Sequence, residues 1–262
     1  MNADITFGRK LASLEFPSVI LTETWHASGL RLQPHTHANA NVNFVLAGRF
    51  VEVVDGQRFN CAAGSVIVKP EGAAHSNDYL GIPTRCLVLE FPNSEKWTKI
   101  LSNPWGSQDA ELMRLGWQIY HEFSCNDAVR KLAIEELVFE FLDYGNREWH
   151  RREIYHAAPK WLKSVCELID CSHSEISVED LAREASVHPR HVMRSFRRFT
   201  GCSIGERLRQ NRVRRAQVLL AQDDLTIAAV AVEVGFYDHS HFVRTFKQLT
   251  GLTPTQYRNL CH

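Results

Sequence analysis

Two histidines separated by one residue, His35 and His37, lie just ahead of a hydrophobic run, NVNFVLAG (41–48), and His75 follows another, GSVIVKP (64–70). Alternate residues of a strand point to the same side, and we expect the second segment to fold back beside the first, so the three imidazoles should converge at one end of a barrel interior. Imidazoles bind zinc, nickel, copper or iron(II), and neutral imidazoles also hydrogen-bond polar molecules. The pattern leaves three alternatives open: a bound metal, a pocket for a small organic ligand, or histidines that only pack.

The segment that must position these histidines, residues 18–92, is predicted to be β-structure. Short runs rich in Val, Ile and Phe alternate with Gly, Pro and Asp-Gly, which is typical of strands and tight turns. The Asp55-Gly56 pair between two such runs predicts a hairpin. Several short strands at this spacing indicate a barrel or sandwich.

The pattern becomes helical after about residue 107. Apolar residues recur at helical spacing from 108 to 144, with a break at SCND (124–127), which predicts a helical hairpin. We expect this hairpin to form a homodimer, because its apolar stripe is broad; the alternative is that it packs wholly against its own barrel. The charged segment 145–159 is the predicted linker between domains.

Charge is distributed unevenly along the 262 residues. Residues 1–159 contain 15 Lys+Arg and 19 Asp+Glu, whereas the remaining residues contain 15 and 11, so the two parts carry −4 and +4. A basic C-terminal part suggests that this part meets a polyanion. The N-terminus has no apolar targeting segment and no run is long enough for a membrane helix, so we expect a cytoplasmic protein without a membrane partner.

The C-terminal third contains an internal repeat. SVEDLAREASVHPRHVMRSFRRFTG (177–201) resembles TIAAVAVEVGFYDHSHFVRTFKQLTG (226–251). Each copy begins at a good N-cap residue, Ser177 or Thr226, and ends at a glycine, Gly201 or Gly251. Each copy is therefore predicted to be a helix, a tight turn and a second helix, the helix-turn-helix plan in which the second helix enters the DNA major groove.

The two second helices carry side chains suited to DNA. Their predicted outward faces hold Arg190, His191, Arg194 and Arg197 in the first, and His239, Ser240, Arg244 and Lys247 in the second. Arginine can bond guanine through two hydrogen bonds, and the other side chains can reach bases or phosphates. The alternative is a helical bundle with solvated polar faces, but two matched copies favour DNA reading. The basic helix 205–222 between the copies could hold the reading helices one DNA turn apart.

On these motifs, residues 160–262 resemble the AraC/XylS transcription regulators, most specifically in VGFYDHSHFVRTFKQLTG and TPTQYR. The resemblance implies base contacts from Arg190, Met193 and Arg194 in the first reading helix, and from His239, Ser240 and Arg244 in the second. Where the family usually has Ser at the start of the first reading helix, this chain has His188 before Pro189. This departure leaves the N-cap of that helix open.

The N-terminal histidines resemble the cupin motifs. Gly29 precedes His35 and His37 by the family spacing, Gly48 closes the first motif, and Gly64, Pro70, Gly72 and His75 form the second. Asn41 stands where the family has a metal-binding Glu. The resemblance implies that His35, His37, Asn41 and His75 form an effector pocket or a metal site.

The expected fold is α+β with two domains: a cupin-like barrel, a helical hairpin and an all-α double helix-turn-helix domain. The expected divisions are residues 1–106 for the effector-sensing barrel, 107–158 for the dimerisation hairpin and linker, and 159–262 for the DNA-binding domain, with units at 177–201 and 226–251.

The resemblance implies a sequence-specific transcription regulator, not an enzyme, that responds to a small-molecule or metal effector. Its expected partners are double-stranded promoter DNA, the effector, a second copy of the chain and, for an activator, RNA polymerase. No cofactor is required, while a divalent transition metal at His35, His37 and His75 stays an alternative. The competing functions are a cupin-type metal-dependent enzyme with a helical appendage and a constitutive architectural DNA-binding protein. Asn41 argues against the enzyme, because metal-assisted oxygen chemistry favours a complete ligand set.

Overall fold

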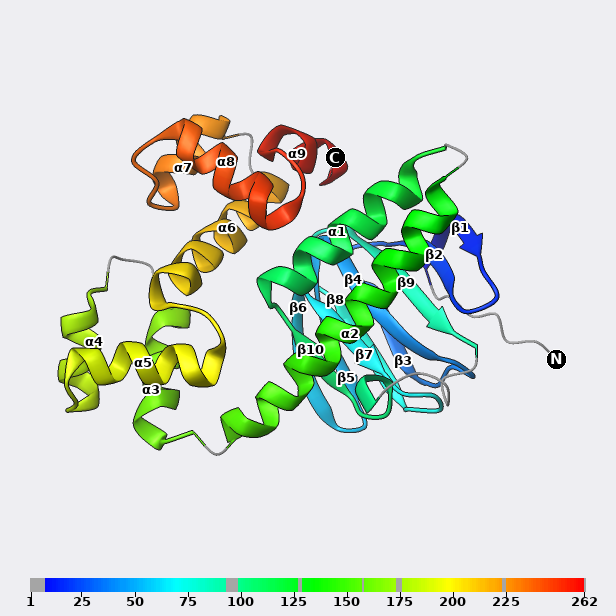
Figure 1. Ribbon diagram of the computed structural model, residues 1–262. Helices are drawn as coiled ribbons and strands as arrows, with labels where there is room; N and C mark the ends of the chain where they lie inside the picture. The colour runs from blue at the N-terminus through cyan, green and yellow to red at the C-terminus, as the bar shows by residue number, and fades with distance from the viewer. Residues whose placement is uncertain are drawn as a thin grey trace.

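The structure is a computed structural model that describes residues 8–92, 99–126, 129–156, 158–172, 176–222 and 225–261. Figure 1 shows the strands gathered on one side of the molecule, two long helices crossing in front of them, and the C-terminal helices on the other side and above. This arrangement matches the predicted α+β class, with a β-barrel ahead of an all-α part.

Among the residues described, the strands form two antiparallel sheets. The six-stranded sheet has the order β1 (Arg9–Glu15), β2 (Ile20–His26), β9 (Thr84–Phe91), β4 (Ala40–Ala47), β7 (Val66–Lys69) and β10 (Trp105–Ser107). The four-stranded sheet has the order β3 (Arg31–His35), β8 (His75–Tyr79), β5 (Arg49–Val54) and β6 (Gln57–Ala62). The sheets enclose a core made of buried residues from both of them: Val45, Phe50, Cys61, Ile67, Tyr79 and Cys86. The predicted barrel is therefore confirmed.

Strand β4 is buried along its whole length because both of its faces are covered. Val45 points into the barrel core, whereas the alternate residues Phe44 and Leu46 join a second core beneath the helices. This two-sided burial explains why NVNFVLAG reads as an almost continuous apolar run rather than as a strict alternation.

The predicted Asp-Gly hairpin joins β5 to β6. Asp55 and Gly56 both have positive φ, 45° and 79°, as the two central residues of a type I′ turn require. The turn pairs Val54 with Gln57 and sets the register of the two strands.

The helical hairpin consists of α1 (Ala110–Ser124) and α2 (Arg130–His156), preceded by the short 3-10 helix η2 (Lys99–Leu101). Asp109 caps α1 by accepting hydrogen bonds from the backbone of Glu111 and Leu112. Most of the segment expected to be the linker, 145–159, is helical, because α2 continues through His156. Ion pairs within α2, such as Arg147 with Asp143 at 3.0 Å, support helix where apolar periodicity is absent.

The C-terminal part is all-α. Its helices are α3 (Lys160–Cys171), α4 (Val178–Ala185), α5 (Pro189–Thr200), α6 (Ile204–Gln222), α7 (Ile227–Glu233), α8 (His239–Thr250) and α9 (Pro254–Cys261). Helices α4 and α5 form the first predicted unit, α7 and α8 form the second, and α6 joins them (Figure 1). None of the helices described has the length and apolar character that crossing a membrane requires.

The two helix-turn-helix units belong to different hydrophobic cores. The first unit has its own core with α3, in which Leu162, Leu181, Val192 and Phe196 are buried. The second unit shares one core with the barrel and the helical hairpin, and that core includes Phe242 and Phe246. The second unit is therefore packed on the barrel and the helical hairpin, whereas the first has a separate core with α3.

Aromatic rings mark the path of this shared core. Trp117 of α1 packs edge to face on Phe44 of the barrel at 5.4 Å and on Tyr257 of α9 at 5.9 Å. Tyr257 in turn lies 5.6 Å from Phe246 of α8. Such contacts stabilise beyond their area burial, so a continuous set of packed rings connects the barrel with the second reading helix.

The turn at Gly48, between β4 and β5, generates a prediction. Gly48 has φ +87°, and a Cβ there would lie 2.6 Å from the Pro83 carbonyl oxygen and 2.7 Å from the Thr84 Cα. Replacement by alanine should cost about 1–2 kcal/mol for the left-handed backbone and about 1–3 kcal/mol for the clash with backbone atoms. Chemical denaturation of the Gly48→Ala variant measures the loss.

Gly29→Ala is the matched control, because Gly29 has φ +77° but nothing within 4 Å of a built Cβ. It should lose only the first of the two costs. Equal destabilisation by the two variants would contradict the close approach of the β8–β9 loop to Gly48.

Candidate functional site

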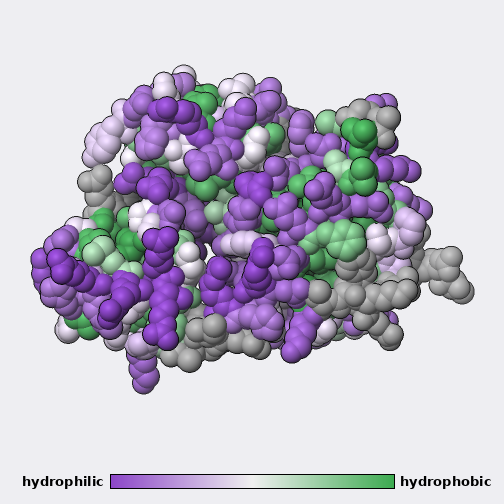
Figure 2. Space-filling view, viewed as in Figure 1, coloured by the Kyte–Doolittle hydropathy of each residue, from purple (hydrophilic) through white to green (hydrophobic). Residues whose placement is uncertain are grey.

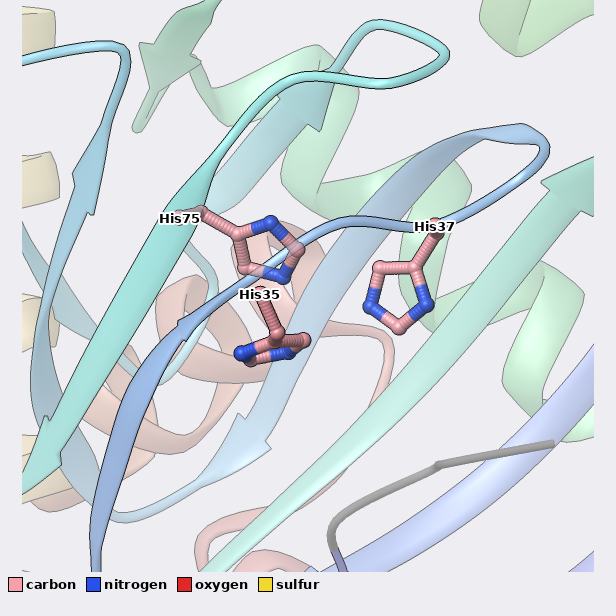
Figure 3. Close-up of side chains that lie close together, drawn as sticks. All are labelled: His35, His37 and His75. Atoms are coloured by element: carbon pink, nitrogen blue, oxygen red, sulfur yellow. The ribbon is translucent and has the colours of Figure 1, made fainter. Parts of the chain in front are cut away.

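The three predicted histidines converge at one end of the barrel (Figure 3). His35 ends β3 and pairs in register with His75 at the start of β8, while His37 lies in the loop that leads into β4. The ring centroids are 4.2 Å apart for His35 and His75, 4.9 Å for His37 and His75, and 5.3 Å for His35 and His37. One ring nitrogen from each lies within 4.8 Å of the others.

Backbone carbonyls fix the orientation of two of these rings. The Nδ1 atom of His35 lies 2.8 Å from the Gln33 oxygen, and Nδ1 of His75 lies 3.1 Å from the Ala73 oxygen. A carbonyl only accepts, so in the neutral rings Nδ1 carries the hydrogen and Nε2 is the acceptor nitrogen. This is the arrangement in which histidine commonly ligates a metal or accepts a hydrogen bond from a ligand.

A buried ion pair that the sequence analysis missed lies beneath the histidines. The Lys69 ammonium of β7 donates to Glu52 Oε1 of β5 at 2.9 Å, and the Asn77 amide of β8 donates to the same oxygen at 2.9 Å. Lys69 and Glu52 are 5% and 0% exposed, so the pair ties the two sheets together inside the barrel. The sequence offered one sign of this ion pair: Glu52 is a charged residue at an inward position of the apolar run RFVEVV (49–54).

Asn41 lies between two charged residues of the same sheet. The strand register places it opposite Lys69 on β7 and opposite Glu90 on β9. Its side chain is buried, and Oδ1 has no hydrogen-bond partner among the residues described. The position that carries a negative charge in the cupin motif is thus a neutral amide with an unmet acceptor.

The environment keeps the imidazoles of His37 and His75 neutral. Burial, aided by the charge of Lys69, lowers the pKa of His37 to about 4 and that of His75 to about 3. The same two causes lower the pKa of His26, deeper in the barrel, to about 4. Neutral rings at ordinary pH suit ligation or hydrogen bonding without prior loss of a proton.

The donor set fits a transition metal in part. Three imidazoles supply the nitrogen ligands that zinc and related metals prefer. Asn41, at the fourth ligand position of the cupin motif, supplies no negative charge. The nearby Lys69 ammonium repels a metal cation. The cavity itself has a volume of about 50 Å³ and is lined by these histidines, Asn43, Asn77 and Tyr79, which is room for a few water molecules or a very small polar ligand.

The two reading helices are capped at both ends. Asp238 begins α8 and accepts from the backbone of Ser240 at 2.9 Å and of His241 at 3.1 Å. At the start of α5 the open question is settled, because His188 Nδ1 accepts from the Arg190 backbone at 3.2 Å. Gly201 and Gly251 end the helices in the left-handed conformation, as predicted.

The residues predicted to contact DNA lie at the surface. Exposed positions on the two reading helices include Arg190, His191, Met193, Arg194, Arg197, His239, Ser240, Arg244 and Lys247. Their inward neighbours Val192, Phe196, Phe242 and Phe246 are buried. Hydrophilic side chains dominate the face of the molecule seen in Figure 2. Each reading helix therefore presents a polar, mainly basic face to its surroundings.

Some arginines of α6 are structural. Arg207 bonds Asp170 of α3 through two nitrogens at 2.8 and 2.6 Å. Arg214 donates to the Gln108 carbonyl and, at 3.0 Å, to Asn211. These two guanidiniums connect α6 to α3 and to Gln108, so they have a structural role and do not contact DNA in the proposed interface.

One predicted DNA contact also faces the helical hairpin. Arg244 and His241 of α8 line a groove of about 690 Å³ whose other wall includes Asp109, Glu111 and Tyr144. A DNA duplex is far too large for such a space. The hairpin therefore limits the directions from which DNA can approach Arg244.

Comparisons with known proteins separate the two parts of the chain. A family model described as a helix-turn-helix domain matches residues 181–260. The HTH-type transcriptional activator RhaR of Escherichia coli (strain K12) is 37% identical over 98 residues, which are 37% of this chain and 35% of that protein. The chain thus spans about a third of the length of the curated relatives that it matches. The predicted helix-turn-helix domain is confirmed.

Two solved structures are also similar to parts of the chain. The DNA-binding domain of AdpA in complex with a target DNA is 30% identical and covers 39% of this chain and 93% of that chain, with a TM-score of 0.35. The Schizosaccharomyces pombe Cnp3 cupin domain is 20% identical and covers 32% of this chain and 68% of that chain, with a TM-score of 0.29.

The lowered pKa values predict how stability depends on pH. The unfolded chain takes up protons at His37 and His75 below about pH 6.5, the ordinary pKa, while the folded chain keeps them neutral until about pH 4 and 3. Stability should therefore fall as the pH falls from 7 toward 4. Urea denaturation at a series of pH values, with EDTA present, measures the slope.

The His75→Asn variant tests the assignment, since it removes one titrating group and keeps a polar side chain. Its slope between pH 7 and 4 should be smaller than that of the unmodified protein. An unchanged slope would show that His75 is not held neutral by its surroundings.

Proposed function

Because residues 181–260 belong to the helix-turn-helix domain family, we propose that the chain is a sequence-specific, DNA-binding transcription regulator of the AraC/XylS type. One observation carries the proposal: two capped helix-turn-helix units, joined by α6, each present a basic and polar reading face. We also propose the division into residues 1–106, 107–158 and 159–262 for sensing, dimerisation and DNA binding.

In the proposed complex, each reading helix contacts both bases and phosphates, through different side chains. We assign base contacts to Arg190, Met193 and Arg194 of α5 and to His239, Ser240 and Arg244 of α8. The remaining exposed residues of these faces, His191, Arg197 and Lys247, are assigned to the DNA backbone. Phosphate contacts position the protein and base contacts provide the sequence preference.

The barrel is proposed to sense a small polar effector at His35, His37, Asn41 and His75. The acceptor nitrogens of the rings and the unmet Asn41 oxygen suit a ligand with hydrogen-bond donors. A divalent transition metal on the three imidazoles is the second candidate, and it would supply a Lewis acid for a ligand. Elemental analysis of untagged protein separates the two. We propose no catalytic turnover at this site.

The assembly is proposed to be a cytoplasmic homodimer that acts on promoter DNA, and that contacts RNA polymerase if it activates. Support for self-association comes from α2, where Leu132 and Phe139 are 71% and 57% exposed and lie one heptad apart. Helix α1 is covered instead by the barrel and by α8 and α9. We therefore propose that the outer face of α2, and not α1, forms the contact between the two copies.

Arginine substitutions on the reading helices test DNA reading. DNA is first selected from a random pool by the full-length protein. The Arg194→Ala and Arg244→Ala variants should each bind this DNA more weakly by about 1–3 kcal/mol and lose preference at one position, because a bidentate arginine contact is lost. Fluorescence anisotropy at several salt concentrations gives the affinities.

Arg198→Ala is the matched control, since Arg198 is an exposed residue of α5 whose guanidinium lies 5.5 Å from the Phe199 ring. It should bind like the unmodified protein. Unchanged affinity in both reading-helix variants, or failure to select any sequence from the pool, would contradict the proposed function.

Charge placed on the outer face of α2 tests self-association. We expect a dimer at tens of micromolar by analytical ultracentrifugation, and a monomer for the double variant Leu132→Asp, Phe139→Asp, because burying two carboxylates is unfavourable. Val232→Asp, at a 73% exposed residue of α7, should remain dimeric. A dimer that tolerates both aspartates would use another surface.

A further inference from the structure

A second cavity lies where the barrel meets the C-terminal helices. This joint cavity has a volume of about 210 Å³ and is lined by Ala63, Ile82 and Gln108 on the barrel side and by Gln217, Val218 and Tyr257 of α6 and α9. Gly48, at the end of β4, also lines it, whereas Asn41 of the histidine pocket lies at the start of β4. At about 3.3 Å per residue, the two sites are roughly 20 Å apart along the strand.

The joint cavity contains a buried amide with unmet hydrogen bonds. Gln217 is 1% exposed, and neither Nε2 nor Oε1 has a hydrogen-bond partner among the residues described. The arginine that precedes it on the same wall does not serve it, because Arg214 donates to the Gln108 carbonyl and to Asn211. Leaving both ends of a buried amide unpaired is costly, so Gln217 indicates that something else pairs with it.

The rest of the cavity wall indicates what kind of ligand could reach Gln217. Apart from the arginines and glutamines, the lining includes Ala62, Ala63, Ile82, Val218 and Ala221, which offer carbon atoms. An occupant therefore needs an apolar body and one polar edge. To satisfy both atoms of Gln217, that edge must accept from Nε2 and donate to Oε1 at the same time. A primary or cyclic amide does so through two parallel hydrogen bonds, whereas a carboxylate has no donor for Oε1.

We propose that the joint cavity binds a small, uncharged amide with an apolar body, and that Gln217 pairs with the amide edge. The proposed site is distinct from the histidine pocket. Its occupant touches the barrel and α6 and α9 together, so it binds best when the second helix-turn-helix unit is docked on the barrel. Ligand binding therefore stabilises this docked arrangement relative to any arrangement in which the two parts separate.

Benzamide is a suitable probe, because it combines an aromatic body with a primary amide. Isothermal titration calorimetry of the full-length protein should give saturable 1:1 binding of benzamide, and benzoate should bind at least tenfold more weakly. Gln217→Leu and Gln217→Met should each weaken benzamide binding at least tenfold. Gln210→Leu is the matched control, because Gln210 is a buried glutamine of the same helix that does not line the cavity; its affinity should be unchanged.

His75→Asn should also leave benzamide affinity unchanged, which separates the joint cavity from the histidine pocket. Three results would overturn the proposal: no saturable benzamide binding, which means that the cavity holds only water; equal affinity in both folded Gln217 variants; or tighter binding of benzoate, which means that the arginines select an anion. DNA affinity, measured in parallel, tests the proposed function separately, because benzamide binding does not depend on it.

Discussion

The packing of Trp117 between Phe44 and Tyr257 decides how the parts of this protein relate to one another. Trp117 is 1% exposed, and it contacts a strand of the barrel on one side and the last helix of the chain on the other. Because Tyr257 and Phe246 continue this packing, the second reading helix shares a core with the barrel. The first unit is buried in a core of its own. The second reading helix is therefore joined to the barrel through an apolar core, whereas the core of the first is formed with α3 and α4.

The barrel interior is polar at one end and apolar at the other, and this division separates two kinds of chemistry. The ion pair of Lys69 and Glu52 lies just below the histidines. A buried pair of this kind is costly to break, so it fixes the spacing of the two sheets where the ligand is proposed to bind. At the opposite end, Gly64 brings a tight turn against α1: a Cβ on Gly64 would lie 2.4 Å from the Met113 sulfur. The histidine end of the barrel and the end that faces the C-terminal helices are thus connected by the same strands.

Local signals were sufficient to predict much of this architecture from the sequence. The Asp55-Gly56 turn, the caps Ser177 and Thr226, and the glycines that end the reading helices each depend on neighbouring residues, and the structure has all of them. The convergence of His35, His37 and His75 was predicted from strand alternation together with the resemblance to the two cupin motifs.

Contacts between distant parts of the chain could not be predicted in this way. Trp117 and Tyr257 are 140 positions apart, and no periodicity links them. Lys69 and Glu52 lie on different sheets, so their ion pair depends on how the sheets face each other. The helix in the C-terminal half of α2 could not be recognised from an apolar stripe. Its stability comes from ion pairs and from packing, as where Gly145 lies against Ile100.

The central claim is that one chain reads two successive major grooves. Methylation interference on DNA selected by the full-length protein tests it most directly, because methylated guanine N7 blocks contacts in the major groove. For each bound chain, we expect two groups of interfering guanines on one face of the duplex, about 10 base pairs apart. A single group, or interference spread evenly along the DNA, would contradict it.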